Sequence, residues 1–538
     1  MKKILLSSVF GPFGVDNAYS RKENVMELFH NQVTREQGMF SLRCHHHSFG
    51  LYFIAENIDA PVTVLDFPSE KAFLRQIKKN YDYVGISFIT SNFAKARRMA
   101  QLVRQYAPAS KIVLGGHGTN IEDIEKQIEN DFICKGEGVK WFRRLLGEDP
   151  DRPFIHPVLP SGFSERTLGI PLKTEAAVLI PGVGCPNACR FCTTSHFFGK
   201  QYTSYFDTGE ELFDACLKME RKLGSREFFV MDENFLKRPQ RARELLQLME
   251  KHNKLYRFGI FSSADTIAEV GVEFMARLGV YFTWIGVESQ KDLFEKNRGI
   301  DLKPLVRDLR EHGIGVLTST ILFLEHHDKD TIWDDIKFTV DLEPDFSQFM
   351  QLAPLPVTAL YREYDEKGML RKDIPYEEWH GQHRIWFRHP HFTPEESEDY
   401  LRRAFRYEYD TLGSGMLRMC ATILRGYRTL AGYHDPMMKK RREQLETIAR
   451  RYYPILPVMK KHAHNPRVQD LTAEILAEYE REFGALPLTQ RLITAVAGFF
   501  AAREAARVKN GNNVYQPKTF RTRYGFGNRG ECGTVVNS

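Results

Sequence analysis

Short apolar segments alternate with longer helical segments through the middle of the chain, and this alternation restricts the fold more than any other feature. The expected strands are Ala176–Pro181, Glu227–Met231, Arg257–Ser263, Phe282–Val287, Gly315–Leu324 and Phe346–Leu352. Repeated strand–helix units of this kind predict a parallel sheet, closed partly or fully into a TIM-type barrel. Functional groups in such a barrel belong on the loops at the carboxyl ends of the strands.

The loops after the first four expected strands all carry groups that can bind a cofactor. In order, they contain GVGCPNACRFCTT (182–194), MDENF (231–235), SSAD (262–265) and GVES (286–289). The first holds Cys185, Cys189 and Cys192 without a fourth cysteine close by. A structural zinc site needs four protein ligands, and a [4Fe–4S] cluster has four irons to bind. The spacing therefore predicts a metal centre whose fourth ligand comes from elsewhere.

This C-x3-C-x2-C loop resembles that of the radical S-adenosylmethionine superfamily. The resemblance implies that Cys185, Cys189 and Cys192 bind three irons of a [4Fe–4S] cluster, with Phe191 beside the adenine. S-adenosylmethionine would chelate the fourth iron, where a low-potential cluster can reduce the sulfonium to give a 5′-deoxyadenosyl radical.

The other three loops resemble the motifs that hold S-adenosylmethionine in that family. The acidic motif is expected to hold the methionine ammonium, which needs acceptor groups. The implied ligands of S-adenosylmethionine are Asp232, Glu233, Asn234, Ser262, Glu288 and Arg298. Because EHHD (325–328) ends the fifth strand on the same rim, His326 and His327 are expected near the substrate.

Residues 1–150 show a second alternating pattern, which predicts a doubly wound, Rossmann-like domain with its ligand at the strand ends. The segments 84–120 and FICKGEG (132–138) resemble the cobalamin-binding subgroup of the superfamily. The resemblance implies that cobalamin contacts Gly11, Asn17, Ser87, Thr90, Gly115 and Gly116.

The loop after the first expected strand, GPFGVDNAYS (11–20), lacks the histidine of the D-x-H-x-x-G motif that ligates cobalt. Cobalamin is therefore expected without a histidine ligand. The alternative is a domain that keeps the fold and has lost the corrin.

The expected organisation is α/β, with the cobalamin-binding-like domain at 1–150 and the catalytic barrel at 170–365. A helical domain at 366–508 and a loosely held basic tail at 509–538 follow. The helical run LITAVAGFFAA (492–502) is too short to span a bilayer; it is expected to be buried, with peripheral membrane contact as the alternative.

Composition restricts the partners and the compartment. A net charge of +6 is small for 538 residues, so nucleic acid is not an expected partner. Clustered cysteines and the lack of a long apolar run favour a cytoplasmic protein.

These features predict a radical enzyme that cleaves S-adenosylmethionine and functionalises an unactivated C–H bond on a small, hydrophobic or secondary-metabolite substrate. Cobalamin-dependent methylation is the expected reaction, with a reductase, flavodoxin or ferredoxin as electron donor. A cobalamin-independent cyclase or rearrangement enzyme is one alternative. A tRNA methylthiolation enzyme and a non-catalytic cobalamin sensor are the others; the former shares the cysteine motif, and the latter leaves the three cysteines without a role.

Overall fold

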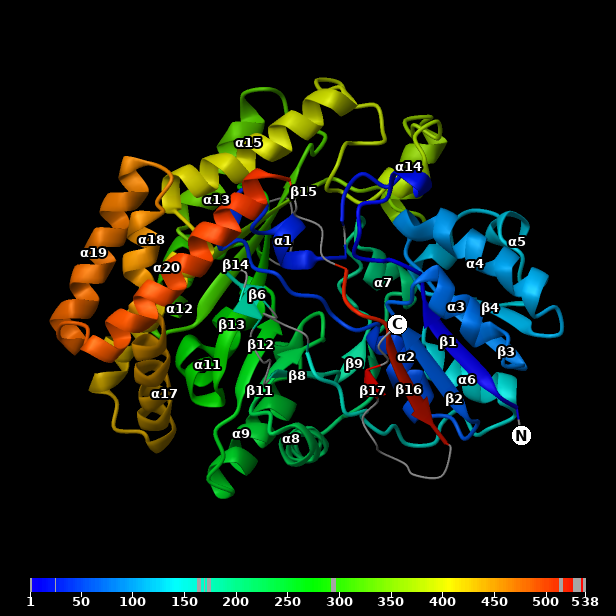
Figure 1. Cartoon of the computed structure of the whole chain (residues 1–538), viewed down its shortest axis with the longest axis horizontal. Helices are drawn as coiled ribbons and strands as arrows, with labels where there is room; N and C mark the ends of the chain where they lie inside the picture. Colours follow the sequence, from blue (N-terminus) through cyan, green and yellow to red (C-terminus); the bar gives the residue numbers. More distant parts are fainter. Residues whose placement is uncertain are drawn as a thin grey trace.

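The computed structural model describes residues 2–24, 26–161, 166–168, 170–171, 176–291, 297–511, 516–525 and 534–535. Two mainly parallel sheets, each flanked by helices, form the N-terminal domain and the barrel, and further helices complete the molecule (Figure 1). This arrangement confirms the predicted α/β fold with a helical C-terminal region.

The N-terminal sheet has the strand order β17-β16-β2-β1-β3-β4-β5 among the described residues. Its parallel strands are β1 (Ile4–Ser8), β2 (Val62–Asp66), β3 (Tyr83–Ser87), β4 (Lys111–Gly115) and β5 (Phe132–Ile133). The order 2-1-3-4-5 is doubly wound, and its ligand edge lies at the carboxyl ends of β1 and β3.

Helices cover both faces of this sheet. Strand residues alternate between two apolar clusters, with Leu6 in one and Leu5 in the other. The first cluster includes side chains of α2 (Phe49–Glu56) and α6 (Gly138–Leu146). The second includes α3 (Glu70–Ile77) and α4 (Phe93–Tyr106), and α5 (Ile124–Gln127) precedes β5.

Part of the expected loose tail is an ordered strand. β16 (Phe520–Tyr524) pairs antiparallel with β2, and β17 (Thr534–Val535) pairs with β16. The Thr519 hydroxyl also donates to the Phe67 carbonyl. The prediction of a loosely held terminus is therefore wrong for 520–524, because these residues cover the backbone groups at the edge of β2.

The second sheet has the order β15-β14-β13-β12-β11-β8 and is parallel throughout. Its strands are β8 (Ala176–Leu179), β11 (Glu227–Val230), β12 (Arg257–Phe261), β13 (Val280–Glu288), β14 (Gly315–Leu322) and β15 (Phe346–Gln351). Chain neighbours are sheet neighbours, as in a barrel, and the ladder between β8 and β15 is open in the described residues, so the barrel is partial.

Helices connect the strands of the barrel, and α8 starts with a Thr208–Glu211 capping box and ends at Gly224 in the left-handed region. The connecting helices are α8 (Gly209–Leu223), α9 (Pro239–Lys251), α10 (Ala264–Val270), α11 (Val272–Leu278), α12 (Leu302–Glu311) and α13 (Thr331–Asp341). The loop after β8 forms β9 (Gly182–Val183), α7 (Thr193–Phe197) and β10 (Thr203–Ser204), and a separate pair, β6 (Arg166–Thr167) and β7 (Ile170–Pro171), precedes the barrel.

The connection between β1 and β2 leaves its own domain and packs against the barrel. It contains α1 (Leu28–Gln32), which lies beside the barrel strands in Figure 1. The Phe29 ring contacts Trp284 and Phe346. Its centroid lies 6.3 Å from that of Trp284 and 5.9 Å from that of Phe346. The Gln348 amide donates to Gln32 Oε1 at 3.0 Å. Side chains on this connection thus join the two domains.

The C-terminal region consists mainly of helices that follow α14 (Ala359–Glu366). They are α15 (Pro394–Leu412), α16 (Gly415–Thr429), α17 (Pro436–Tyr452), α18 (Leu456–Lys461), α19 (Pro466–Phe483) and α20 (Leu488–Lys509). The buried Arg441 of α17 donates to the carbonyls of Val280 and Gly313 at the start of the barrel strands. None of the described helices combines the length and apolar composition that a bilayer span requires.

Gly426 in α16 should tolerate no side chain, because a Cβ there would lie 2.3 Å from the Gly313 Cα. We expect Gly426→Ala to lower the free energy of unfolding by about 1–3 kcal/mol, measured by denaturant unfolding. Gly498→Ala in α20, where nothing lies within 4 Å of the new Cβ, is the matched control. It should be neutral or stabilising by up to about 1 kcal/mol, and equal losses in both variants would contradict the close packing of α16.

Candidate active site

The loop with the three cysteines folds back on itself after β8. Its β9 pairs antiparallel with β10, and α7 begins directly after Cys192. The Ser195 hydroxyl donates to the Cys185 carbonyl at 2.6 Å, and the Cys192 amide donates to the Cys189 carbonyl at 3.0 Å. These bonds hold all three cysteines in one compact turn.

The three thiols influence one another electrostatically. The pKa of the half-buried Cys192 thiol is raised to about 12, mainly by burial and in part by negative charge on Glu233, Cys189 and Cys185. A bound cation removes this mutual penalty, because thiols ligate metals as thiolates. Three adjacent thiols on one loop are a donor set that fits three irons of a [4Fe–4S] cluster.

Residues between the cysteines attach this loop to the opposite side of the barrel. Arg190 forms ion pairs with Glu325, after β14, and with Glu363 of α14. Phe191 is half-buried and packs against the apolar cluster around the end of β14. The neighbouring loops therefore hold the side chain of Phe191, the predicted adenine contact, in position.

Asp232 is neutralised within the protein. Its Oδ2 atom accepts hydrogen bonds from Arg241 at 2.8 Å and from Tyr202 at 2.7 Å, and both ion-pair side chains are 2% exposed. Its Oδ1 atom accepts the Asn234 amide at 3.1 Å. The Asp232 carboxylate thus holds the loop after β11 in position. The backbone carbonyl of Asp232 is then left to bind a ligand. No local sequence pattern indicates Arg241 as this partner, because it lies on α9.

Glu233 has different surroundings from its neighbour. It is exposed to water at the rim, yet enough protein surrounds it for desolvation to raise its pKa to about 7. The charge of Asp232 contributes to this rise in pKa, and a hydrogen bond with Thr194 opposes it. Because Thr194 is on α7, Glu233 lies beside the cysteine loop and offers an acceptor there.

Asn234 and Ser262 meet, as expected for loops on one rim. Ser262 donates to Asn234 Oδ1 at 3.0 Å, and Asn234 Nδ2 donates to Ser263 Oγ at 2.9 Å. Both predicted residues are buried and bind each other. They join the loops after β11 and β12.

Glu288 ends β13 with an unusual backbone conformation. Its φ is 64°, and the pairing with β14 shifts register just before it. Such a conformation stores strain of about 1–3 kcal/mol, a common feature of functional sites. Asn297, which the sequence analysis did not single out, holds this segment by donating to the Gly286 and Val287 carbonyls at 2.9 Å. Arg298, the predicted carboxylate partner, is exposed.

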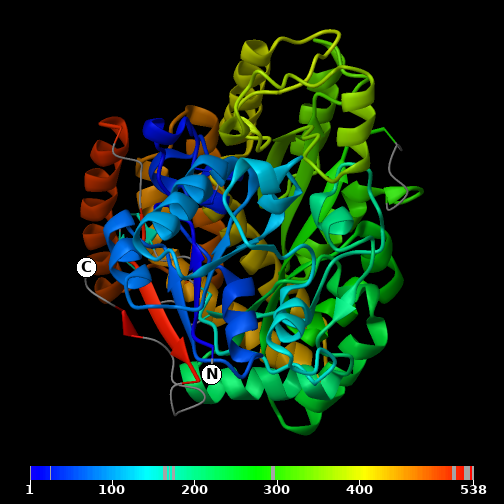
Figure 2. The ribbon, with the colours of Figure 1, turned by 90° about the vertical axis from the view of Figure 1, so that its right-hand side faces the viewer.

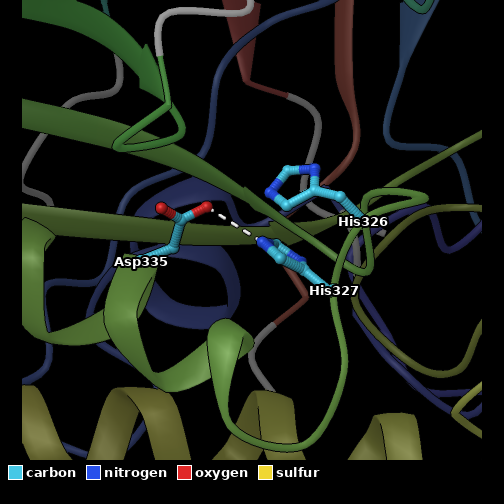
Figure 3. Close-up of side chains that lie close together, drawn as sticks. All are labelled: His326, His327 and Asp335. Carbon is cyan, nitrogen blue, oxygen red and sulfur yellow. Dashed lines mark hydrogen bonds and ion pairs between the residues drawn. The ribbon is translucent and has the colours of Figure 1, made fainter.

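Figure 3 shows the two histidines after β14 together with Asp335 of α13. His327 is buried; its Nε2 atom lies 2.9 Å from Asp335 Oδ2, and its Nδ1 atom accepts the Leu324 amide. Both ring nitrogens are therefore engaged, and Asp335 also accepts the Gln290 amide. The structure gives His327 a positioning role for the segment after Glu288, in place of the predicted substrate contact.

His326 is half-exposed and lies with its ring 4.5 Å from that of His327. Ligand atoms of His326, His327 and Asp335 lie within 4.8 Å of one another. An ion at this point would compete with the hydrogen bonds of His327, so the geometry favours a supporting network over a metal site. Of the two histidines, His326 is the one accessible to a substrate.

A cavity of about 450 Å³ opens at the ligand edge of the N-terminal sheet. It runs down one face of the sheet, since its lining contains pairs of residues two apart on three strands. These pairs are Leu6 and Ser8, Gly85 and Ser87, and Val113 and Gly115. Residues of α2 and α6 cover the cavity, and Phe197 and Phe198 close it on the barrel side.

The residues predicted to contact cobalamin divide into two groups. Ser87, Gly115 and Gly116 line the cavity, whereas Gly11 and Thr90, although described, are outside its lining. The Gly11 carbonyl accepts Lys95 and Arg21 within the protein. The Asn17 side chain lies outside the described part of the chain.

Gly115 ends β4 and Gly116 follows it, and each position needs a glycine for a different physical reason. A Cβ on Gly115 would meet nothing within 4 Å, so this glycine leaves space in the cavity. Gly116 has a φ of 85°, and a Cβ there would lie 2.5 Å from the Phe88 carbonyl oxygen. The backbone itself therefore requires Gly116. The cavity is mostly apolar and opens at the strand ends, so its lining residues would suit part of a bound cobalamin.

His117 joins the cavity to the cysteine loop. It lines the cavity, and its ring lies 4.5 Å from that of Phe197, which follows Cys192 on α7. Burial lowers the pKa of His117 to about 4, so it is neutral. Nothing in the local sequence around Gly115 and Gly116 indicates that this histidine meets the other domain.

Comparisons with known proteins agree with this architecture. The B12 binding domain model matches residues 39–146, and the Radical SAM superfamily model matches residues 179–339. An uncharacterized methyltransferase of Pyrococcus horikoshii is 23% identical over 400 residues, covering 66% of this chain and 86% of that protein. Bacteriochlorophyllide d C-8(2)-methyltransferase of Chlorobaculum tepidum is 26% identical over 335 residues, covering 56% and 71%.

A solved structure shares the fold over most of its length. It is the radical S-adenosylmethionine methyltransferase TsrM from Kitasatospora setae, with its tryptophan substrate and an S-adenosylmethionine analogue bound. The TM-score is 0.54 at 16% identity, and the match covers 84% of this chain and 99% of TsrM.

The buried ion pair under the rim should be essential for stability. Arg241→Gln leaves the Asp232 carboxylate buried without its cation, so we expect a loss of about 3–5 kcal/mol in unfolding free energy. Arg238→Gln is the control, because Arg238 and its partner Asp207 are 41% and 72% exposed; it should change stability by less than about 1 kcal/mol. Similar denaturant midpoints for both variants would show that the buried pair is not needed.

Proposed function

Because the chain belongs to the radical S-adenosylmethionine superfamily, in the subgroup with a B12-binding domain, we propose that it methylates a small hydrophobic molecule. The two domains imply a [4Fe–4S] cluster, S-adenosylmethionine and cobalamin as its cofactors. When bound, these cofactors supply radical chemistry at carbon and a transferable methyl group.

The observation that carries this proposal is the wall shared by the two candidate cofactor sites. Phe197 of α7 closes the cavity in the N-terminal domain, and α7 begins at Cys192. Methyl transfer to a carbon that has lost a hydrogen atom needs both cofactors to face one substrate. A single short helix between the two sites meets this requirement.

We assign residue roles from their surroundings. Cys185, Cys189 and Cys192 would hold the cluster, and Glu233 would accept the methionine ammonium beside it. Asn234, Ser262 and Glu288 would shape the rest of that site, and His326 is the candidate for substrate contact. A reductase, flavodoxin or ferredoxin would supply the electrons.

The substrate class is proposed mainly from similar proteins, and the barrel beneath the site has an aromatic interior that the β1–β2 connection covers. Phe261 stacks on Trp284 with ring centroids 5.1 Å apart, and His46 stacks on Phe229 at 5.4 Å. Two similar proteins of Chlorobaculum tepidum are named for methylating bacteriochlorophyllide d. We propose a substrate of this general kind, lipid-like or pigment-like.

Anaerobically reconstituted protein should bind about four irons per chain. Combined Cys185→Ala, Cys189→Ala and Cys192→Ala should remove the iron and the visible absorbance, since no other described loop offers three thiols. Cys216→Ala, at a buried cysteine on α8, should keep the cluster. Iron quantitation measures the cluster content of each variant. Stoichiometric zinc without iron would contradict the proposed chemistry.

Cobalamin uptake tests the second cofactor. Gly115→Val should weaken cobalamin binding at least about tenfold, because the new side chain starts from a Cβ that stands in open space at the wall of the cavity. Binding is measured by corrin absorbance after desalting, with Gly432→Val, an exposed glycine in open space, as the control.

The iron content of both variants should match that of the unchanged protein. If cluster-loaded protein retains no cobalamin, methylation from methylcobalamin is excluded and the cobalamin-independent alternative takes its place. Support for a cyclase reaction comes from the similarity to an anaerobic magnesium-protoporphyrin IX monomethyl ester cyclase of Rubrivivax gelatinosus, 22% identical over 331 residues.

A further inference from the structure

Helix α20 exposes an apolar surface that the rest of the described chain leaves uncovered. Leu488 is 82% exposed, and Leu492 and Phe499 are each 68% exposed. Ile493 and Val496 on the same helix are about half exposed. These five make up most of the large apolar side chains that are exposed in the described residues.

The opposite face of α20 is already buried. Ala497 and Ala501 pack into the core cluster, and the helix rests on the 3-10 turn Gly38–Phe40 and on α18. Positions 488, 492, 496 and 499 follow the helical period, so the exposed residues form one stripe. A helix that is apolar on both faces needs a cover on its free face.

The charges beside the stripe have one sign. The exposed charged residues of α20 are Arg491, Arg503 and Lys509. Its single acid, Glu504, is buried and accepts Arg507 at 2.8 Å. Arg523 of β16 and Lys518 just before it add exposed positive charge, and Figure 2 shows α20 and β16 on the same side of the molecule.

We propose that α20 docks the protein on an anionic membrane surface. Its apolar stripe would enter the boundary between headgroups and acyl chains, and its cations would meet lipid phosphates. A second copy of the chain is a less favourable partner for the stripe. Stacking the stripes of two copies would bring Arg491 and Arg503 of one copy against the same cations of the other, and these charges repel. The inference does not depend on the reaction proposed above.

Docking in this orientation has a consequence for access to the barrel. The 3-10 turn under α20 belongs to the same connection as α1, which packs on the concave side of the barrel. The membrane would therefore lie on the same side of the molecule as the β1–β2 connection.

Sedimentation of full-length, cluster-loaded protein with lipid vesicles tests the proposal. The protein should bind vesicles of phosphatidylcholine mixed with phosphatidylglycerol, and binding should weaken in high salt. Leu492→Glu with Phe499→Glu should weaken binding at least about tenfold. Arg491→Gln with Arg503→Gln should weaken it roughly tenfold on anionic vesicles and little on phosphatidylcholine alone.

Ile155→Glu, which charges an exposed apolar residue away from α20, is the matched control and should bind as the unchanged protein does. Iron content and far-UV circular dichroism confirm that each variant is folded. Failure of the unchanged protein to bind anionic vesicles at low salt would overturn the proposal. So would a dimer in solution that Phe499→Glu dissociates without any vesicle binding, since the stripe would then join two copies of the chain.

Discussion

The contact between the β1–β2 connection and the barrel is the constraint on which the rest of the structure depends. Phe29 lies against Trp284 and Phe346, and Gln32 binds Gln348, so side chains from the first domain occupy the concave side of the second. With this connection in place, the ligand edges of both sheets turn toward one another. The neighbourhood of His117 and Phe197 follows from that orientation, and so does the possibility of one substrate between two cofactors.

A second layer of polar contacts holds the loops that carry the site. Arg241 neutralises Asp232, Asp335 binds His327 and the Gln290 amide, and Asn297 binds two carbonyls before Glu288. These contacts are buried or partly buried, so their geometry is shielded from water and costly to disturb. The rim can therefore present Glu233 and His326 from loops that are themselves fixed.

Sequence reasoning predicted the parallel strands of both sheets and the loops that share a rim, because these depend on local periodicity and on the rule that parallel strand ends meet. It did not predict partners that are distant in the chain. The two acids of DENF look alike in sequence, and only Arg241 on α9 distinguishes the neutralised Asp232 from Glu233. His326 and His327 are likewise adjacent, and Asp335 separates their roles. The path of the β1–β2 connection had no local signal at all.

The pairing of β16 with β2 makes folding of the first domain depend on residues made much later. The hydrogen bond from Thr519 to Phe67 spans 452 positions in the chain, and β16 adds an antiparallel strand to a sheet whose parallel strands lie in the first quarter of the sequence. As the polypeptide emerges from the ribosome, β2 would present an open edge until residue 524 arrives. Such long-range closure is slow, and open edges invite aggregation. Chaperone assistance during synthesis would therefore matter more for this protein than its size alone suggests.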